Sequence, residues 1–504
     1  MTVQSVVGDA EIEAVAATHP QVERAVVSDG VIQVMPADAA PQTEFVAQWR
    51  RLYDDLYAGD SDDSGTGSSG SASRGASDGG PDGGPDGGAA SAGGPMSDFS
   101  GWTSSYTGDL IPAEQMEEWR AATVERIRGL HPSRVLEIGV GSGLLLWHLA
   151  PDCAEYRATD FSPVTIANLR ARLRSSGVPW ASRVHLRAAE AVETDRFPEG
   201  YFDTVIINSV TMHFPGHGYM RRVVEQALRV LAPGGRLFIG DNRNLSLLPE
   251  FVTEIQRTQH PSAAPAELRD RVDEAVAGHE WLLLAPEYFV ATARELPDVA
   301  GVDIQLKRGS QVNELTSFRF DVVLHKGPAP VRSLTGVPRL PFAGRPELTA
   351  ELRRRPGEDL RVTGIPNRAL LRLLASAAAV RRGEEPSPAQ EEAGLLPEDL
   401  HLLAEQLGRR VVVTGSAQPG EMDAVFLSAP EEEPLTDLYD PVEPLKSASC
   451  HVNYPQAAEL AEHVRRFVAE RLPGSDVPAV EIVNAFPRTT DGLRNLEELH
   501  GSRS

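Results

Sequence analysis

The chain has 504 residues and is acidic, with 48 Lys and Arg against 72 Asp and Glu and a formal net charge of −24. This balance argues against nucleic-acid and anionic-membrane partners, because phosphate binding needs clustered basic side chains. No apolar run approaches the ~20 residues that span a bilayer, and we expect no signal peptide at the N-terminus. The two cysteines exclude a disulfide scaffold and a four-cysteine zinc site, and they favour a cytoplasmic protein.

The first elements precede a long stretch of low complexity. A helix is expected over Asp9–His19, two short strands around the Asp29–Gly30 turn, and an amphipathic helix over Phe45–Tyr57. Residues 58–97 are dominated by Gly, Ser, Ala, Asp and Pro, and offer almost no apolar side chains for a core. We therefore predict a disordered linker there, which should be cleaved first by protease and should be dispensable for stability.

Strands and helices then alternate. Helices are predicted over Ala113–Leu130, from Leu144, and over Pro163–Ser175 and Tyr219–Leu231; strands are predicted over Val135–Ile138, Tyr156–Thr159, Val184–Leu186, Thr204–Asn208 and Arg236–Gly240. A turn is expected at Pro233–Gly235, and strands 302–307 and 318–324 are expected to pair antiparallel. This alternation predicts an α/β fold, a parallel sheet with helices on both faces.

The C-terminal third gives weaker patterns, because it is rich in Pro, Arg, Glu and Leu. Helices are expected over Ala369–Arg382 and Ala457–Leu472, strands over Arg410–Val413 and Ala479–Val483, and a solvated acidic loop over Glu431–Glu433. These elements are too few to predict how residues 327–450 are arranged.

One stretch carries the clearest chemical signal. A hydrophobic strand that contains Glu137 leads into a G-x-G-x-G turn made by Gly139, Gly141 and Gly143. Glycines let the backbone turn sharply and approach a ligand closely. The turn disfavours NAD, since the dinucleotide fingerprint is G-x-G-x-x-G and Gly143 comes one residue early. Glu137 favours a ligand with a cationic amino-acid tail over a pyrophosphate.

Two later carboxylates fit a nucleoside. Asp160 ends the second predicted strand, about 20 residues after Gly139, where a carboxylate accepts hydrogen bonds from ribose hydroxyls. Glu190 follows the third strand, next to Ala189, where an adenine would lie. Together with the Pro233–Gly235 turn, these features resemble class I S-adenosylmethionine-dependent methyltransferases. The resemblance implies a Rossmann-like sheet and S-adenosylmethionine as the cofactor.

Further motifs are similar to methyltransferase domains embedded in non-ribosomal peptide synthetases. They are Asp98–Gly108, Ile111–Pro112, Met116–Trp119, Asn208–Val210, His213–Pro215, Gly240–Leu245, Asn313–Leu315, Phe318–Asp321, Ile365–Arg368 and Val452–Pro455. The similarity extends over residues 45–455 apart from the linker. The chain departs from the family at His213, where tyrosine is usual.

The two ends of the chain carry a second resemblance, to the small C-terminal subdomain of an adenylation domain. Its motifs are Gly8–Val15, His19–Pro20, Ala25–Val27, Val464–Pro473, Val477–Ala479 and Pro487–Gly492. The resemblance implies a small α+β remnant formed by residues 1–44 and 456–504, interrupted by a methyltransferase domain (45–57 and 98–326) with a C-terminal extension (327–455). We expect no adenylation, because the large nucleotide subdomain is missing and Leu493 replaces the family's lysine.

The resemblance also implies site residues. The implied cofactor contacts are Trp102, Tyr106, Glu137, Gly139, Gly141, Gly143, Asp160, Phe161, Ala189, Glu190, Asn208 and Ser209. His213 follows the fourth strand, where substrates of this fold approach the methyl group, and is the candidate general base, since a histidine titrates near pH 7. Asp241 and Glu314 are candidates to hold the acceptor amine or to replace His213 as the base, and Arg243 is considered as their ion-pair partner. No metal is expected, because the histidines lack ligand spacing.

The leading interpretation is N-methylation of an aminoacyl or peptidyl thioester held by a carrier protein on a separate synthetase chain. Methylation at oxygen or carbon, on a carrier-bound or free substrate, stays open. A non-catalytic methyltransferase-like scaffold and an epimerase are alternatives from other classes; the intact Glu137, glycine turn and Asp160 argue against a scaffold that has lost its cofactor.

Overall fold

A computed structural model describes residues 8–28, 30–37, 42–58, 98–99, 101–385, 394–428, 433–473 and 475–483. The chain divides into two compact units, the first formed by Met1–Pro41 with Tyr454–Ser504 and the second by Gln42–Asn453. The predicted linker beyond Ala58, most of the predicted acidic loop, and Leu493 lie outside the described residues. Within the described ranges, every helix is too short or too polar to cross a membrane.

The first unit joins both ends of the chain in one small α+β structure. It contains α1 (Asp9–Ala16), β1 (Val22–Ser28), β2 (Val31–Pro36), α14 (Ala457–Arg471) and β16 (Ala479–Ile482). The predicted hairpin is confirmed, since β1 pairs antiparallel with β2, and β16 adds to β2 in parallel. Apolar side chains of the two helices and the sheet, such as Ile12, Ile32 and Val464, form its core.

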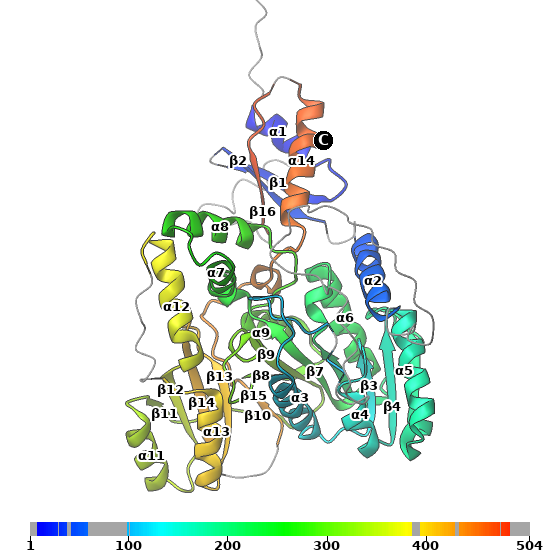
Figure 1. Cartoon of the computed structure of the whole chain (residues 1–504), viewed down its shortest axis with the longest axis vertical. Helices are drawn as coiled ribbons and strands as arrows, with labels where there is room; N and C mark the ends of the chain where they lie inside the picture. Colours follow the sequence, from blue (N-terminus) through cyan, green and yellow to red (C-terminus); the bar gives the residue numbers. More distant parts are fainter. Residues whose placement is uncertain are drawn as a thin grey trace, which may run out of the picture. The chain divides into compact units, whose positions relative to one another are not determined.

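The second unit is built on a seven-stranded sheet with the order β5-β4-β3-β6-β7-β9-β8. Strands β4, β3, β7, β9 and β8 of this sheet are labelled in Figure 1. The strands are β3 (Arg134–Ile138), β4 (Glu155–Asp160), β5 (Val184–Ala188), β6 (Phe202–Asn208), β7 (Leu231–Arg243), β8 (Val299–Leu306) and β9 (Arg319–Lys326). Strands β3 to β7 are parallel, whereas β9 is antiparallel to both β7 and β8. The predicted α/β sheet and its antiparallel pair are therefore confirmed.

Helices pack on both faces of this sheet, α6 and α9 on one face and α3 and α5 on the other. The helices of this unit up to β9 are α2 (Gln42–Ala58), α3 (Ala113–Arg128), α4 (Leu146–Leu149), α5 (Pro163–Ser176), α6 (His217–Val230), α7 (Leu248–Gln259), α8 (Pro265–Ala277), α9 (Pro286–Glu295) and α10 (Glu314–Ser317). Alternation along β6 sends Val205 and Ile207 to a core shared with α6 and α9, and Ile206 to a core shared with α3 and α5. Short 3-10 helices are η2 (Ala150–Asp152), η3 (Pro179–Arg183), η4 (Thr211–His213), η5 (Leu245–Leu247) and η7 (Ala448–His451).

Three details differ from the sequence prediction. The Pro233–Gly235 turn lies inside β7 as a bulge, because Leu231 pairs with Phe202 and Arg236 already pairs with Thr204. Gly234 has φ +77° at this bulge, a conformation that L side chains rarely adopt. The helix expected from Leu144 is only the four-residue α4, and α7 to α9 were not predicted.

Residues beyond β9 form a second, smaller sheet in the same unit. Its order is β11-β12-β14-β13, from β11 (Arg339–Pro341), β12 (Leu360–Pro366), β14 (Glu421–Leu427) and β13 (Arg410–Gly415), with α11 (Arg345–Arg354), α12 (Arg368–Arg381) and α13 (Pro397–Gln406). Strands β10 (Arg332–Ser333) and β15 (Leu435–Thr436) form a separate parallel pair. Helix α12 contacts α7 and α8, where Arg372 pairs with Glu254 at 2.7 Å, so this extension supports helices next to the central sheet.

Candidate functional site

A cavity of about 790 Å³ lies at the carboxyl ends of the parallel strands, where open α/β sheets bind ligands. Eleven of the predicted site residues line it: Trp102, Tyr106, Glu137, Gly139, Gly141, Asp160, Phe161, Ala189, Asn208, Ser209 and His213. The structure therefore brings together residues from the ends of β3, β4 and β6 with the loop before α3. Four predicted residues do not line the cavity, namely Gly143, Glu190, Asp241 and Glu314.

The glycine turn needs its glycines for conformation and for space. Gly139, Gly141 and Gly143 all have positive φ, at 78°, 52° and 90°. A Cβ on Gly139 would lie 2.3 Å from Cγ2 of Val210, and one on Gly143 would lie 3.0 Å from Cδ1 of Leu169. Gly143 thus supports the turn from behind, against the core, while Gly139 and Gly141 face the cavity.

Two buried carboxyls line the cavity beside this turn. Asp160 accepts hydrogen bonds from the backbone N–H groups of Gly141 and Ser162, both at 3.0 Å, and burial raises its pKa to about 6. Glu137 accepts a hydrogen bond from the Tyr156 hydroxyl at 2.8 Å, and burial raises its pKa to about 8. Glu137 is therefore mostly protonated at pH 7, and a cation that entered the cavity would favour its ionised form.

Helix α2 forms one wall of the cavity, which the sequence did not reveal. Its residues Val46, Trp49, Leu52 and Tyr53 line the cavity. Arg50 on the same helix pairs with Glu190 at 2.7 Å, so the carboxylate that we expected beside an adenine instead holds α2. The amphipathic pattern of this helix was visible, but nothing in it indicated which surface the helix covers.

His213 lies in η4 beside α2 and requires a correction. Its ring centroid is 4.4 Å from that of Trp49, and its Nε2 lies 2.9 Å from the Tyr53 hydroxyl. Burial, with further contributions from Arg243 and Arg319, lowers the pKa of His213 to about 3. The prediction that His213 titrates near pH 7 is therefore wrong, and its imidazole is neutral at physiological pH.

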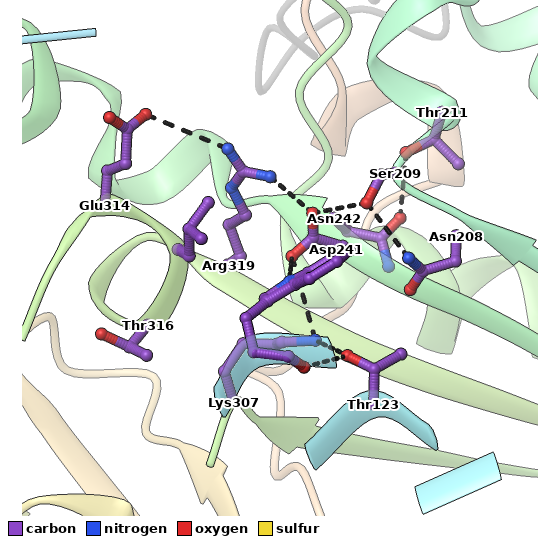
Figure 2. A network of polar contacts seen from close by, with 12 residues as sticks. Thr123, Asn208, Ser209, Thr211, Asp241, Asn242, Lys307, Glu314, Thr316 and Arg319 are labelled. Carbon is purple, nitrogen blue, oxygen red and sulfur yellow. Dashed lines mark hydrogen bonds and ion pairs between the residues drawn. The ribbon is translucent and has the colours of Figure 1, made fainter. Parts of the chain in front are cut away.

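Asp241 is part of a buried network behind the cavity wall (Figure 2). Its carboxylate accepts hydrogen bonds from Trp119 Nε1 at 2.9 Å, Ser209 Oγ at 2.7 Å and Arg319 Nη1 at 2.5 Å. Burial alone would raise the pKa of Asp241, but Arg319 and then Lys307 hold it below its usual value. The side chain is fully paired and anionic, so it positions the wall rather than holding an amine.

Glu314 has a similar structural role. It accepts hydrogen bonds from the backbone N–H and the hydroxyl of Ser105, at 2.8 Å and 2.7 Å, and lies 3.9 Å from Arg319. Ser105 and Arg319 line the cavity, whereas Glu314 does not. The expectation that Glu314 or Asp241 contacts the acceptor is therefore not met by the geometry, because both carboxylates pair with groups that separate them from the cavity.

The wall beyond His213 contains residues that sequence reasoning did not assign to the site. Arg243, previously considered as a partner of Asp241 or Glu314, instead stacks on Trp281, with its guanidinium carbon 3.7 Å from the ring centroid. His279 and Trp281 come from the loop after α8 and carried no motif. Three buried atoms of this wall, Asn208 Oδ1, His213 Nδ1 and His279 Nε2, have no hydrogen-bond partner among the described residues.

The protein family described as "Methyltransferase domain" matches residues 136–237, which run from β3 into β7. The chain carries a methyltransferase domain. The domain implies S-adenosylmethionine as the cofactor, and the residues present fit it, because the buried Asp160 carboxyl, able to accept from ribose hydroxyls, and a neutral but ionisable Glu137 lie in one cavity with the glycine turn. Elsewhere, no three His, Cys, Asp or Glu side chains of the described residues gather as metal ligands would.

Relatives of the chain are nonribosomal peptide synthetases. CymA of Salinispora arenicola, named as a nonribosomal peptide synthetase, is 37% identical over 497 residues, which are 96% of this chain and 6% of CymA. Chondramide synthase cmdD of Chondromyces crocatus is 36% identical over 78% of this chain and 11% of its own length. The chain thus spans a small part of these synthetases. Among solved structures, N-methyltransferase NodS of Bradyrhizobium japonicum WM9 aligns with a TM-score of 0.26 and 19% identity, over 40% of this chain and 97% of NodS.

Replacing Asp160 tests the cofactor end of the cavity. Asp160→Ala removes the carboxylate that would accept from ribose hydroxyls, and we expect binding to weaken by about 1.5–3 kcal/mol. Calorimetry with S-adenosylhomocysteine measures this loss. Asp152→Ala, at an exposed ion pair with Arg128, is the control and should bind as the wild type does. Near-unchanged affinity in Asp160→Ala would show that Asp160 does not contact the cofactor.

Cofactor binding is also expected to release protons near pH 7. Glu137 has a pKa of about 8 in the free protein, and the cationic amine of the ligand should lower it, so the carboxyl ionises on binding. The heat of binding S-adenosylhomocysteine at pH 7 should then vary with the ionisation enthalpy of the buffer. The dependence should disappear in Glu137→Gln, whose side chain has no proton to release. Heat that is independent of buffer at pH 7 would contradict this assignment.

Proposed function

We propose that the chain transfers a methyl group from S-adenosylmethionine to the amine of an aminoacyl or peptidyl thioester on a carrier protein. The observation that carries the proposal is the single cavity that joins the glycine turn and Asp160 to the wall with Asn208, His213 and His279. The synthetase relatives support a carrier-bound acceptor, since such enzymes assemble peptides.

The charges at the acceptor end favour a neutral amine. An ammonium has no lone pair and cannot act as a nucleophile, so an N-methylating site must bind the uncharged form. Arg243 and Arg319 line this end, and the two carboxylates nearest Arg319 lie behind the wall. The same charges that lower the pKa of His213 would lower the pKa of a bound ammonium.

The chain's residues orient the acceptor in this proposal. When bound, S-adenosylmethionine supplies an electrophilic methyl group. His213 accepts an N–H hydrogen bond from the neutral amine at Nδ1, while Nε2 donates to Tyr53, and the lone pair of the amine stays free for reaction. Helix α2 and Trp281 exclude water from the acceptor, and much of the acceleration comes from this orientation.

Residues 1–44 and 456–504, nearly all of which belong to the first unit, are proposed to be the remnant of an adenylation subdomain. Its pairing of β16 with β2 supports a unit assembled from both ends of the chain around an insertion. We expect no amino-acid-dependent pyrophosphate exchange. Exchange above background would contradict this part of the proposal.

The function is tested by incubating the protein and S-adenosylmethionine with a panel of aminoacyl carrier proteins. Mass spectrometry should find one added methyl group, and fragmentation should place it on the amine nitrogen. Asp160→Ala at the same protein concentration is the control. A methyl group on oxygen or carbon would select the alternative chemistry, and loss of stereochemical purity without methylation would indicate an epimerase.

A further inference from the structure

Arg243 is held in the cavity wall with its guanidinium in a defined plane. It is the last residue of β7 and is 6% exposed. Its guanidinium carbon lies 3.7 Å from the ring centroid of Trp281 and 5.2 Å from that of Phe251. Because an arginine that stacks on a ring directs its N–H groups outward in the guanidinium plane, this arrangement favours in-plane acceptors such as carbonyl or carboxylate oxygens.

Trp281, on which Arg243 stacks, is fixed by a residue far along the chain. Asn453 donates a hydrogen bond to the carbonyl oxygen of Trp281 at 2.8 Å and accepts one from the N–H of Leu283 at 2.7 Å. Trp281 also contacts Trp49 of α2, with ring centroids 6.4 Å apart. The stacking surface for Arg243 is therefore set by three separate segments of the second unit.

His279 provides the second, independent observation. It lines the same cavity, is 5% exposed, and its Nε2 has no hydrogen-bond partner among the described residues. Buried polar side-chain atoms are nearly always hydrogen-bonded, so an unpartnered buried nitrogen beside a cavity indicates a ligand atom. Burial, and then the charge of Arg243, lower the pKa of His279 to about 4. The neutral imidazole of His279 can donate a hydrogen bond to an oxygen atom. The positive charge of Arg243 beside it disfavours the binding of a second cation.

We propose that Arg243 and His279 bind the carbonyl oxygen of the acceptor's acyl group, with His279 donating from Nε2. This inference rests on the proposed function and adds the residues that recognise the acyl carbonyl, so that the neutral amine lies at His213 and the carbonyl at Arg243. Recognition of the carbonyl places the neighbouring amine, because only one carbon separates the two groups. An amine without an adjacent carbonyl would lack the second contact.

The test compares ligands that differ in the carbonyl, and each affinity is expressed per neutral amine, because the carbonyl also lowers the pKa of the neighbouring ammonium. Calorimetry on the protein loaded with S-adenosylhomocysteine measures binding of the best-bound member of a panel of α-aminoacyl pantetheine thioesters. The matched ligand is the thioether in which a methylene replaces that carbonyl. We expect the wild type to bind the thioester about 10- to 100-fold more tightly, the range for hydrogen bonds to a charged group. The free amino acid is the third ligand, since its carboxylate shares the carbonyl chemistry.

Substitutions of Arg243 and His279 test whether these two residues cause the preference for the thioester over the thioether. In Arg243→Met and His279→Phe the thioester-to-thioether ratio should fall toward one, with affinity for S-adenosylhomocysteine unchanged, which also reports that the fold is intact. Arg243→Lys keeps the charge without the planar fork and should retain part of the ratio if Arg243→Met does not fold. Arg471→Met is the control, because Arg471 stacks on Phe467 at 3.4 Å in the first unit and should leave the ratio unchanged.

The outcomes separate the two proposals. An equal affinity of the wild type for thioester and thioether, or a ratio that survives in both Arg243→Met and His279→Phe, overturns the carbonyl site even if methylation occurs. A ratio that depends on Arg243 supports the site even if no acceptor is methylated, in which case the proposed function fails alone. Tighter binding of the free amino acid than of the thioester supports the carbonyl site and contradicts a carrier-bound acceptor.

Discussion

Arg319→Met is expected to lower the stability of the second unit by about 3–5 kcal/mol, the cost of removing one partner from a buried ion pair. Arg319 pairs with Asp241 and approaches Glu314, and these side chains are at most 5% exposed. Loss of the guanidinium leaves Asp241 paired with Lys307, whose Nζ lies 3.8 Å from Oδ1 of Asp241. The six tryptophans of the chain all lie between Gln42 and Asn453, so their fluorescence during urea unfolding reports this unit.

The deficit should depend on pH in a defined direction. The pKa of Asp241 is lowered in the folded protein, so its pairing stabilises the fold above the ordinary aspartate pKa and is lost as pH falls through the lowered value. The difference between Arg319→Met and the wild type should therefore be full at pH 7 and shrink below about pH 4. Arg294→Met, at an exposed pair with Glu443, is the matched control and should cost far less, because exposed ion pairs contribute little to stability. An equal loss in both variants would contradict the buried network.

His213→Phe is expected to lower turnover about 10²-fold, because a small misplacement of the reacting group has an effect of that size. Phenylalanine keeps the ring contact with Trp49 but loses Nδ1 and the contact between Nε2 and Tyr53. Affinity for S-adenosylhomocysteine should not change. Since the pKa of His213 is lowered to about 3, the ascending limb of the pH–rate profile belongs to the acceptor's own ammonium and should remain in the variant.

Tyr53→Phe is the companion variant for this prediction. It removes only the hydroxyl that fixes the imidazole, so its effect on turnover should be in the same direction and smaller. Disappearance of the ascending limb in His213→Phe would show instead that His213 titrates as the base. Turnover of His213→Phe at the wild-type rate would show that His213 does not orient the acceptor.

The cofactor end of the site could be predicted because its signals are local. A hydrophobic strand, an acidic residue and three glycines are consecutive, and Asp160 ends the next strand of a regular alternation. Each residue's place at the carboxyl edge follows from the parallel order of β3, β4 and β6. Predicting these strands correctly was therefore enough to place their last residues at the same edge of the sheet. The pairing of β8 with β9 could also be predicted, because the alternation of apolar and polar residues in each strand is a local signal.

The acceptor end could not be predicted from such patterns. Trp49 comes from a helix before the predicted linker, and Trp281 is fixed by Asn453, so the wall depends on contacts between distant segments. The roles of Asp241 and Glu314 were also invisible, because their sequence positions say nothing of Arg319 between them. The low pKa of His213 arises from burial and from cations that come from two other strands.

The parallel pairing of β16 with β2 closes a loop that contains the whole second unit. In polymer terms, a folded insertion holds its two ends at a fixed separation, whereas an unfolded one is a flexible chain of about 400 residues. The entropy of closing a loop grows with its length, by about 0.6 kcal/mol for each doubling. Unfolding of the second unit therefore lowers the free energy of unfolding of the first, even without any contact between them. The stability of the small sheet at the chain ends thus depends on whether the insertion is folded.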